Sequence, residues 1–334
     1  MFRRSCTLLA KTPRQQVLEW LGSIDTVLFG SDGVLWKFDD AIEGSVEAFN
    51  AMRAKGKRCF IVTNDASMVS SDLAQKAMRL GFRVGEQEVL SSAACISNYL
   101  VAKKFNKKAL VVGEAGIQKE LGKAGIESVT IDQDAGDKQM KDFARQFDVD
   151  PDVGAVVVGC DSSFNVSKIV VACTYLLNPK LLFLGTCMDT SYQVCQKRVT
   201  VGAAAMVVPI EKSSNRKPLI MGKPNPQMVN KLRHSGSHNP EKTLVIGDRL
   251  SSDIIFARNC GFKSLLVGSG ATSLEEAQKL QSEGNGRKLM MVPDTFLPSL
   301  GHLMEYLCED EGKAEKKRVE KQKIRLHSYK PRLV

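Results

Sequence analysis

Short apolar runs that do not alternate with polar residues are the feature of this 334-residue chain that most limits its fold. Seven such runs occupy residues 26–29, 59–63, 108–112, 155–158, 181–184, 244–246 and 264–267, with helical patterns between several of them. Strands that are apolar on both faces are typical of parallel sheets with helices packed on either side. The sequence therefore predicts an α/β fold built on a doubly wound parallel sheet.

Polar residues follow four apolar stretches, in the order Gly30-Ser31-Asp32-Gly33, Thr63-Asn64-Asp65, Gly222-Lys223-Pro224 and Gly247-Asp248-Arg249. Each segment alone could be an ordinary turn or a helix cap. In parallel sheets, however, ligands bind outside the carboxyl ends of the strands. Taken together, the four segments therefore indicate a single functional site.

These segments, in this order, resemble the haloacid dehalogenase superfamily of aspartate-nucleophile phosphatases. The closer resemblance is to the branch that holds phosphoglycolate phosphatase, pyridoxal phosphate phosphatase (chronophin) and the 4-nitrophenyl phosphatases. The matching stretches are Gly33-Val34-Leu35-Trp36, Val62-Thr63-Asn64, Val157-Val158-Gly159, Gly185-Thr186, Gly222-Lys223-Pro224-Asn225-Pro226 and Gly247-Asp248-Arg249-Leu250. The resemblance implies a Rossmann-like core with a large inserted α/β cap domain, and hydrolysis of small phosphorylated metabolites.

The resemblance also implies a role for each matching residue. Asp32 would be the general acid and base for the leaving oxygen and for water. Thr63, with Asn64 nearby, would bind the phosphoryl oxygens, and Lys223 would neutralise their charge.

Magnesium is the cofactor that the resemblance implies, held by carboxylates and phosphate. Asp248 and the main-chain carbonyl of Asp32 would be its ligands, and Asp253 would support either the metal site or the lysine.

One position breaks the family pattern. The nucleophilic aspartate of the Asp-x-Asp-Gly motif is Gly30 here, which removes both the attacking oxygen and a metal-binding carboxylate. Strand alternation predicts that the Ser31 side chain leaves the opposite face, and Asp25 would be ~16 Å away along an extended strand. If Asp32 were the nucleophile, Val34 would stand at the acid/base position, where it cannot act. We therefore expect a catalytically impaired or inactive phosphatase that retains phosphate binding, with weakened magnesium affinity.

Two alternatives remain open at this stage. The chain could be an active phosphatase that uses direct water attack or another acid, or a non-catalytic scaffold. Ser251, where the family commonly has an acid, and Gly202-Ala203-Ala204-Ala205, where it has a Gly-Thr-Gly-Ser-like stretch, are further departures from the pattern.

The resemblance also predicts the domain layout. Residues 1–18 would be a basic extension, 19–105 and 218–305 the core, 106–217 the cap and 306–334 a basic tail. The cap would carry Asp189 toward the substrate and form a homodimer contact.

Charge is concentrated at the two ends of the chain. Of the formal net charge of +10, the basic excess lies in residues 1–18 and 313–334, so the body is close to neutral. We favour a disordered basic start over a mitochondrial presequence, and hence a cytoplasmic location. We see no fold-level nucleic-acid motif and no apolar run of the ~20 residues needed to span a bilayer. None of the nine cysteines has Cys-x-x-Cys spacing, which indicates free thiols in a reducing compartment.

Overall fold

The structure is a computed structural model that describes residues 2–131, 135–136, 139–195, 198–234, 239–284 and 286–308. Its larger sheet has the strand order β1-β16-β15-β14-β2-β5-β6, with every neighbouring pair parallel. These strands are β1 (Thr7–Leu8), β2 (Thr26–Phe29), β5 (Arg58–Thr63), β6 (Val89–Ser91), β14 (Thr243–Gly247), β15 (Lys263–Val267) and β16 (Thr295–Leu297). The parallel α/β core is therefore confirmed.

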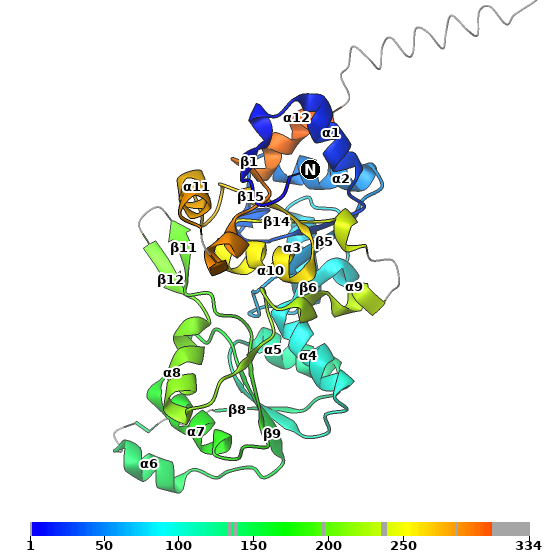
Figure 1. Cartoon of the computed structure of the whole chain (residues 1–334). Helices are drawn as coiled ribbons and strands as arrows, with labels where there is room; N and C mark the ends of the chain where they lie inside the picture. Colours follow the sequence, from blue (N-terminus) through cyan, green and yellow to red (C-terminus); the bar gives the residue numbers. More distant parts are fainter. Residues whose placement is uncertain are drawn as a thin grey trace, which may run out of the picture.

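A second parallel sheet forms the cap, which lies below the core in Figure 1. Its order is β13-β10-β9-β7-β8, where β7 is Lys108–Val112, β8 Ser128–Thr130, β9 Val153–Val158, β10 Leu182–Gly185 and β13 Leu219–Ile220. Two antiparallel pairs complete the described strands: β3 (Trp36–Lys37) with β4 (Asp40–Ala41), and β11 (Ser191–Cys195) with β12 (Arg198–Val201). Because β13 pairs with β10, the cap sheet reaches past the predicted boundary at residue 217.

Helices cover both faces of each sheet (Figure 1). Their bounds are α1 Arg14–Gly22, α2 Ser45–Ala54, α3 Ser70–Arg79, α4 Ser92–Ala102, α5 Ala115–Lys123, α6 Met140–Gln146, α7 Val166–Leu176, α8 Ala204–Ser214, α9 Asn230–His234, α10 Ile255–Cys260, α11 Leu274–Glu283 and α12 Met304–Leu307. Val27 and Phe29 of β2 pack into a buried cluster with α1, α2 and α3, whereas Leu28 packs with α4 and α10. Both faces of β2 are therefore buried, as its non-alternating sequence requires.

The N-terminal segment corrects one expectation. Instead of a disordered start, Thr7 and Leu8 pair with Thr295 and Phe296 at the edge of the large sheet. Leu9 is fully buried, and its carbonyl accepts a hydrogen bond from the Tyr306 hydroxyl at 3.0 Å. The first residues are thus part of the core packing, although they carry no strand pattern.

The C-terminal tail can be described only at its beginning. Tyr306 and Leu307 are buried in the core cluster that also contains Leu9. The predicted basic tail otherwise falls on residues 309–334, outside the described residues. Within the described ranges, no helix has the length and apolarity to cross a membrane.

Candidate active site

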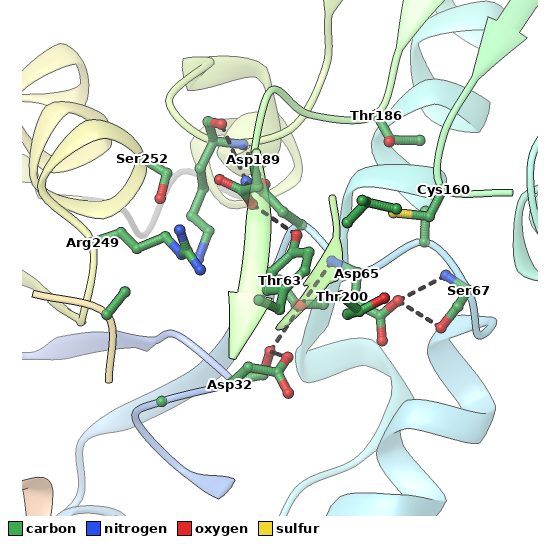
Figure 2. A pocket seen from close by; sticks show the side chains of 18 of the residues that line it. Asp32, Thr63, Asp65, Ser67, Cys160, Thr186, Asp189, Thr200, Arg249 and Ser252 are labelled. Carbon is green, nitrogen blue, oxygen red and sulfur yellow. Dashed lines mark hydrogen bonds between the residues drawn. The ribbon is translucent and has the colours of Figure 1, made fainter. Parts of the chain in front are cut away.

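A cavity of about 730 Å³ lies between the carboxyl ends of the core strands and the cap (Figure 2). Seven of the eight predicted site residues line it: Asp32, Thr63, Asn64, Asp189, Lys223, Asp248 and Asp253. They come from the last residue of β5, from the loops after β2, β5, β10, β13 and β14, and from the short π-helix Leu250–Ile254. The fold thus brings together residues as far apart in sequence as Asp32 and Asp253.

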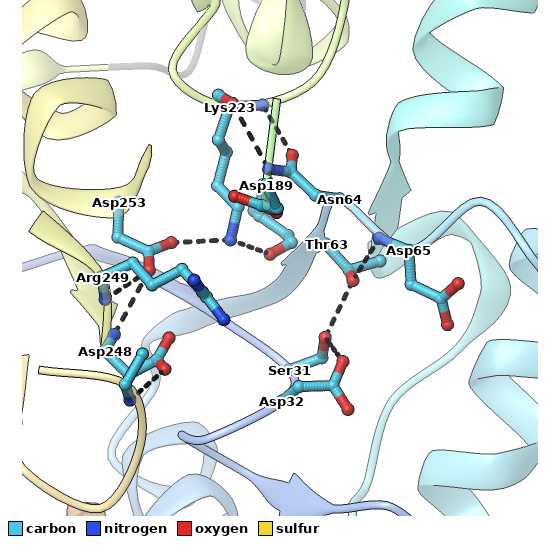
Figure 3. A network of polar contacts seen from close by, with 12 residues as sticks. Ser31, Asp32, Thr63, Asn64, Asp65, Asp189, Lys223, Asp248, Arg249 and Asp253 are labelled. Carbon is cyan, nitrogen blue, oxygen red and sulfur yellow. Dashed lines mark hydrogen bonds and ion pairs between the residues drawn. The ribbon is translucent and has the colours of Figure 1, made fainter. Parts of the chain in front are cut away.

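Lys223 is held at the base of this cavity by a buried ion pair (Figure 3). Its Nζ lies 2.6 Å from Oδ1 of Asp253 and donates to the Val62 carbonyl at 2.9 Å. Burial alone would lower the pKa of Lys223, but the Asp253 carboxylate outweighs it, so the pKa is raised. The ammonium is therefore charged and fixed in position.

Asp253 positions other groups rather than offering a free carboxylate. Its Oδ1 accepts from Lys223, and its Oδ2 accepts from the main-chain N–H groups of Asp248 and Arg249 at 3.2 and 3.1 Å. Of the two roles considered from sequence, these contacts favour support of the lysine. They also fix the loop that carries Asp248.

Asp248 is buried against the loop after β2. Its Oδ2 accepts from the Ala271 N–H at 2.8 Å, and burial together with the Asp253 carboxylate raises the pKa of Asp248 to about 7. Gly33 has φ +77°, and a Cβ there would lie 2.6 Å from Asp248 Oδ2. Glycine is therefore required at residue 33 both by its backbone conformation and by this close approach.

Ser31 corrects the sequence-based prediction that its side chain leaves the opposite face. Its hydroxyl lines the cavity, 2.8 Å from Thr63 Oγ1 and 3.0 Å from Asp32 Oδ2. Alternation was the wrong guide because β2 ends at Phe29, before Ser31. The surrounding protein, and next the Asp65 carboxylate, raise the pKa of Asp32, although the side chain still reaches solvent.

A Cβ can be accommodated at Gly30 with a small adjustment of its surroundings. Its φ lies outside the left-handed region, and a Cβ would meet Val34 Cγ2 at 3.1 Å, the Ile246 carbonyl at 3.5 Å and Asp253 Oδ1 at 3.8 Å. Only the Val34 contact is tight, and a small movement of that methyl group would relieve it. Unlike Gly33, Gly30 is therefore not required by its local structure.

A hydrogen-bonded chain connects core and cap across the cavity. Asn64 Oδ1 accepts from the Lys223 N–H at 2.7 Å, and its Nδ2 donates to Asp189 Oδ2 at 3.0 Å. The Tyr192 hydroxyl donates to the same oxygen at 3.0 Å, and Arg249 Nη2 donates to the Ser191 carbonyl at 2.8 Å. Asp189 is thus buried and joins residues of the cap to Asn64 of the core.

Sequence reasoning assigned no role to Tyr192 or Arg249. Arg249 could have been noticed because it directly follows Asp248, whereas nothing around Tyr192 signals a role.

The oxygen donors fit a magnesium ion only in part. Mg²⁺ prefers six oxygen ligands in near-ideal octahedral geometry. Asp248 and Asp32 are available, but Asp253 is fully engaged and Gly30 contributes no carboxylate. In the part of the chain that the structure describes, no three acidic, histidine or cysteine side chains are grouped to hold a metal. These residues therefore do not, by themselves, make a magnesium site.

Known proteins match the chain over both sheets. Haloacid dehalogenase-like hydrolases match residues 27–127, and a second HAD-hydrolase-like family matches residues 220–296. Glycerol-3-phosphate phosphatase of Mus musculus is 35% identical over 86% of this chain and 92% of its own length. Phosphoglycolate phosphatase 1A of Arabidopsis thaliana is 37% identical over 76% of this chain and 71% of its own length.

A solved structure of a hypothetical protein from Pyrococcus horikoshii has the same fold. It superposes with a TM-score of 0.69 at 27% identity, covering 85% of this chain and 100% of its own. The relatives that these comparisons identify are phosphatases of small phosphoesters. This chain belongs to the haloacid dehalogenase-like hydrolases.

Proposed function

We propose that this protein binds small phosphomonoesters in the cavity and hydrolyses them far more slowly than its relatives do. The observation that carries the proposal is the buried Lys223–Asp253 pair, which lines the same cavity as the Thr63 hydroxyl, while residue 30 supplies no side chain. A charged lysine and a hydroxyl suit phosphoryl oxygens. Loss of a covalent nucleophile removes several orders of magnitude in rate, while binding and electrostatics leave some catalysis.

The chemical class of ligand follows from the relatives. Two of them are named for glycerol-3-phosphate and phosphoglycolate, which are both small phosphomonoesters. We infer that magnesium binds weakly and mainly together with phosphate, because residue 30 supplies no carboxylate and both oxygens of Asp253 already accept hydrogen bonds. Binding and orientation are therefore assigned to Lys223, Thr63 and Asn64, and proton transfer at the leaving oxygen to Asp32.

The test compares the native chain with Gly30→Asp. Hydrolysis of 4-nitrophenyl phosphate and phosphoglycolate is measured with magnesium, alongside calorimetric titration with phosphate and with Mg²⁺. We expect near-zero native turnover, measurable phosphate binding, and a gain of at least ~10²-fold in the variant. Since a Cβ at residue 30 meets Val34 Cγ2 at 3.1 Å, Gly30→Asp with Val34→Ala is the companion variant.

Two results would contradict the proposal. Native turnover at ordinary enzyme rates, ~1 to 10³ per second, would show a working phosphatase. Absence of phosphate binding by the folded native chain would favour the scaffold alternative. The homodimer contact through the cap and the cytoplasmic location stay predictions, which sedimentation and cell fractionation would test.

A further inference from the structure

The Ser31 hydroxyl stands beside the place where a bound phosphoryl group would lie. Its Oγ is 2.8 Å from Oγ1 of Thr63, the hydroxyl assigned to phosphoryl oxygens. Thr63 Oγ1 also accepts from the Asp65 N–H at 3.0 Å, which leaves its own hydrogen free to donate into the cavity. A phosphoryl oxygen that accepts a hydrogen bond from Thr63 therefore lies close to Ser31 Oγ.

Ser31 also has a partner that can remove its proton. Its Oγ donates to Asp32 Oδ2 at 3.0 Å, and a single hydroxyl hydrogen serves one acceptor at a time (Figure 3). When Ser31 donates this hydrogen to Asp32, it donates none to Thr63, and the lone pairs of Ser31 Oγ are not used by a hydrogen bond to Thr63. Paired hydroxyl and carboxylate side chains within hydrogen-bond reach are the arrangement of an activated nucleophile.

Gly30 keeps the approach open. A Cβ there would lie 3.8 Å from Asp253 Oδ1, so a longer side chain at residue 30 would start beside the Lys223–Asp253 pair. Without it, a phosphoryl group held by Lys223 and Thr63 meets no side chain from residue 30. Ser31 is 3% exposed, so its hydroxyl is shielded from bulk water and opens to the cavity it lines.

We propose that Ser31 accepts the phosphoryl group of a bound phosphomonoester and becomes phosphoserine. This inference rests on the proposed function, because it requires a phosphomonoester in the cavity. The Ser31 Oγ–phosphorus bond forms as the bond from phosphorus to the leaving oxygen breaks. The Ser31 proton passes to Asp32, and Asp32 returns a proton to the leaving alcohol, so no other reactant is consumed.

The second half of the cycle is expected to be slow. Phosphoserine is itself a phosphomonoester and hydrolyses far less readily than the acyl phosphate that an aspartate would form. Uncatalysed hydrolysis of phosphate monoesters is among the slowest biological reactions known. The protein should therefore collect about one phosphate per chain and then turn over very slowly.

The experiment uses the full chain with 4-nitrophenyl phosphate and magnesium. We expect a burst of about one 4-nitrophenol per chain, an intact mass increased by one phosphate, and peptide mapping that places the phosphate on Ser31. Ser31→Ala should lose the burst and still bind phosphate by calorimetry. The control is Ser45→Ala, which removes another buried hydroxyl, bonded to the Leu35 carbonyl at 2.7 Å outside the cavity, and should keep the burst.

Each other outcome has a definite meaning. Phosphate binding without a phosphorylated Ser31 in the native chain would overturn the inference and leave the proposed function intact. Phosphate mapped to Thr63 or elsewhere, or the same steady turnover in the native chain and in Ser31→Ala, would also overturn it. No phosphate binding by the folded native chain would defeat the proposed function itself. Peptide mapping of the phosphorylated native chain shows whether Ser31 carries the phosphate even if Ser31→Ala fails to fold.

Discussion

Arg249 of the core lies over the ring of Tyr192 in the cap, with its guanidinium carbon 5.2 Å from the ring centroid. The same guanidinium donates to the Ser191 carbonyl, so the residue after Asp248 holds the β11–β12 hairpin against the cavity. The hairpin therefore meets the core at the edge of the proposed binding site (Figure 1).

Arg249→Ala should weaken phosphate binding and loosen the hairpin. A cation–π contact contributes ~0.5–2 kcal/mol and a hydrogen bond from a charged donor ~1.5–3 kcal/mol. We expect roughly a tenfold loss of affinity by calorimetry and faster amide exchange in β12. Arg216→Ala is the matched control, because Arg216 also bonds main-chain carbonyls, those of Leu181 and Asn178, but within the cap. If both variants lowered the affinity for phosphate equally, a specific role of Arg249 in phosphate binding would be contradicted.

Asp253→Ala should cost both stability and binding. Removing one partner of a buried ion pair leaves the other charge unpaired, which typically costs ~3–5 kcal/mol. Urea unfolding measures the loss of stability, and calorimetry measures the loss of phosphate affinity. Asp294→Ala breaks a comparable buried pair with Arg258, 2.8 Å apart and away from the cavity. It should destabilise the protein and leave phosphate affinity unchanged in the folded fraction, and a drop in affinity there would count against a specific role for Asp253.

Leu9→Ala should destabilise the core by ~2–5 kcal/mol, the usual cost of truncating a fully buried leucine. The measurement is the free energy of unfolding in urea. Leu177→Ala serves as the control because Leu177 is 81% exposed, and surface substitutions usually stay within ~0.5 kcal/mol. If the two variants proved equally stable, the packing of the N-terminal segment described above would be wrong.

Chemical labelling of the Cys160 thiol should show whether a ligand occupies the cavity. Burial raises the pKa of Cys160, a residue that lines the cavity, to about 11, and that of Cys59 to about 12. Since the thiolate is the reactive form, labelling of Cys160 should rise about tenfold for each pH unit between pH 8 and 10. Bound phosphomonoester should protect it. Cys308, exposed and outside the cavity, should label at pH 8 without protection, and ligand protection of Cys308 would undermine the assay.

Much of the fold was predictable because a strand that is buried on both faces of a sheet appears in the sequence as a short continuous apolar run. Residues 26–29 and 108–112 were predicted as strands with the bounds that β2 and β7 have. By contrast, the two-residue strand Thr7–Leu8 has no pattern of its own and exists through pairing with a strand almost 290 residues away. Local rules cannot predict such a pairing.

The site was predictable where chemistry follows a strand end. Lys223 and Asp253 were each expected at the site, but their pairing depends on the fold and on no spacing in the sequence. The direction of Ser31 was missed because the exact end of β2 decides it. Because β2 ends at Phe29, alternation no longer fixes the direction of a side chain two residues further on.

The pairing of β1 with β16 also has a consequence for synthesis. The strand β1 is synthesised almost 290 residues before its partner β16. At about 5–20 residues per second, the N-terminal segment waits many seconds for that partner. During this time Leu9, which is buried in the finished protein, has no core to enter. Thr7 and Leu8 therefore have no strand partner on the nascent chain until β16 has been synthesised.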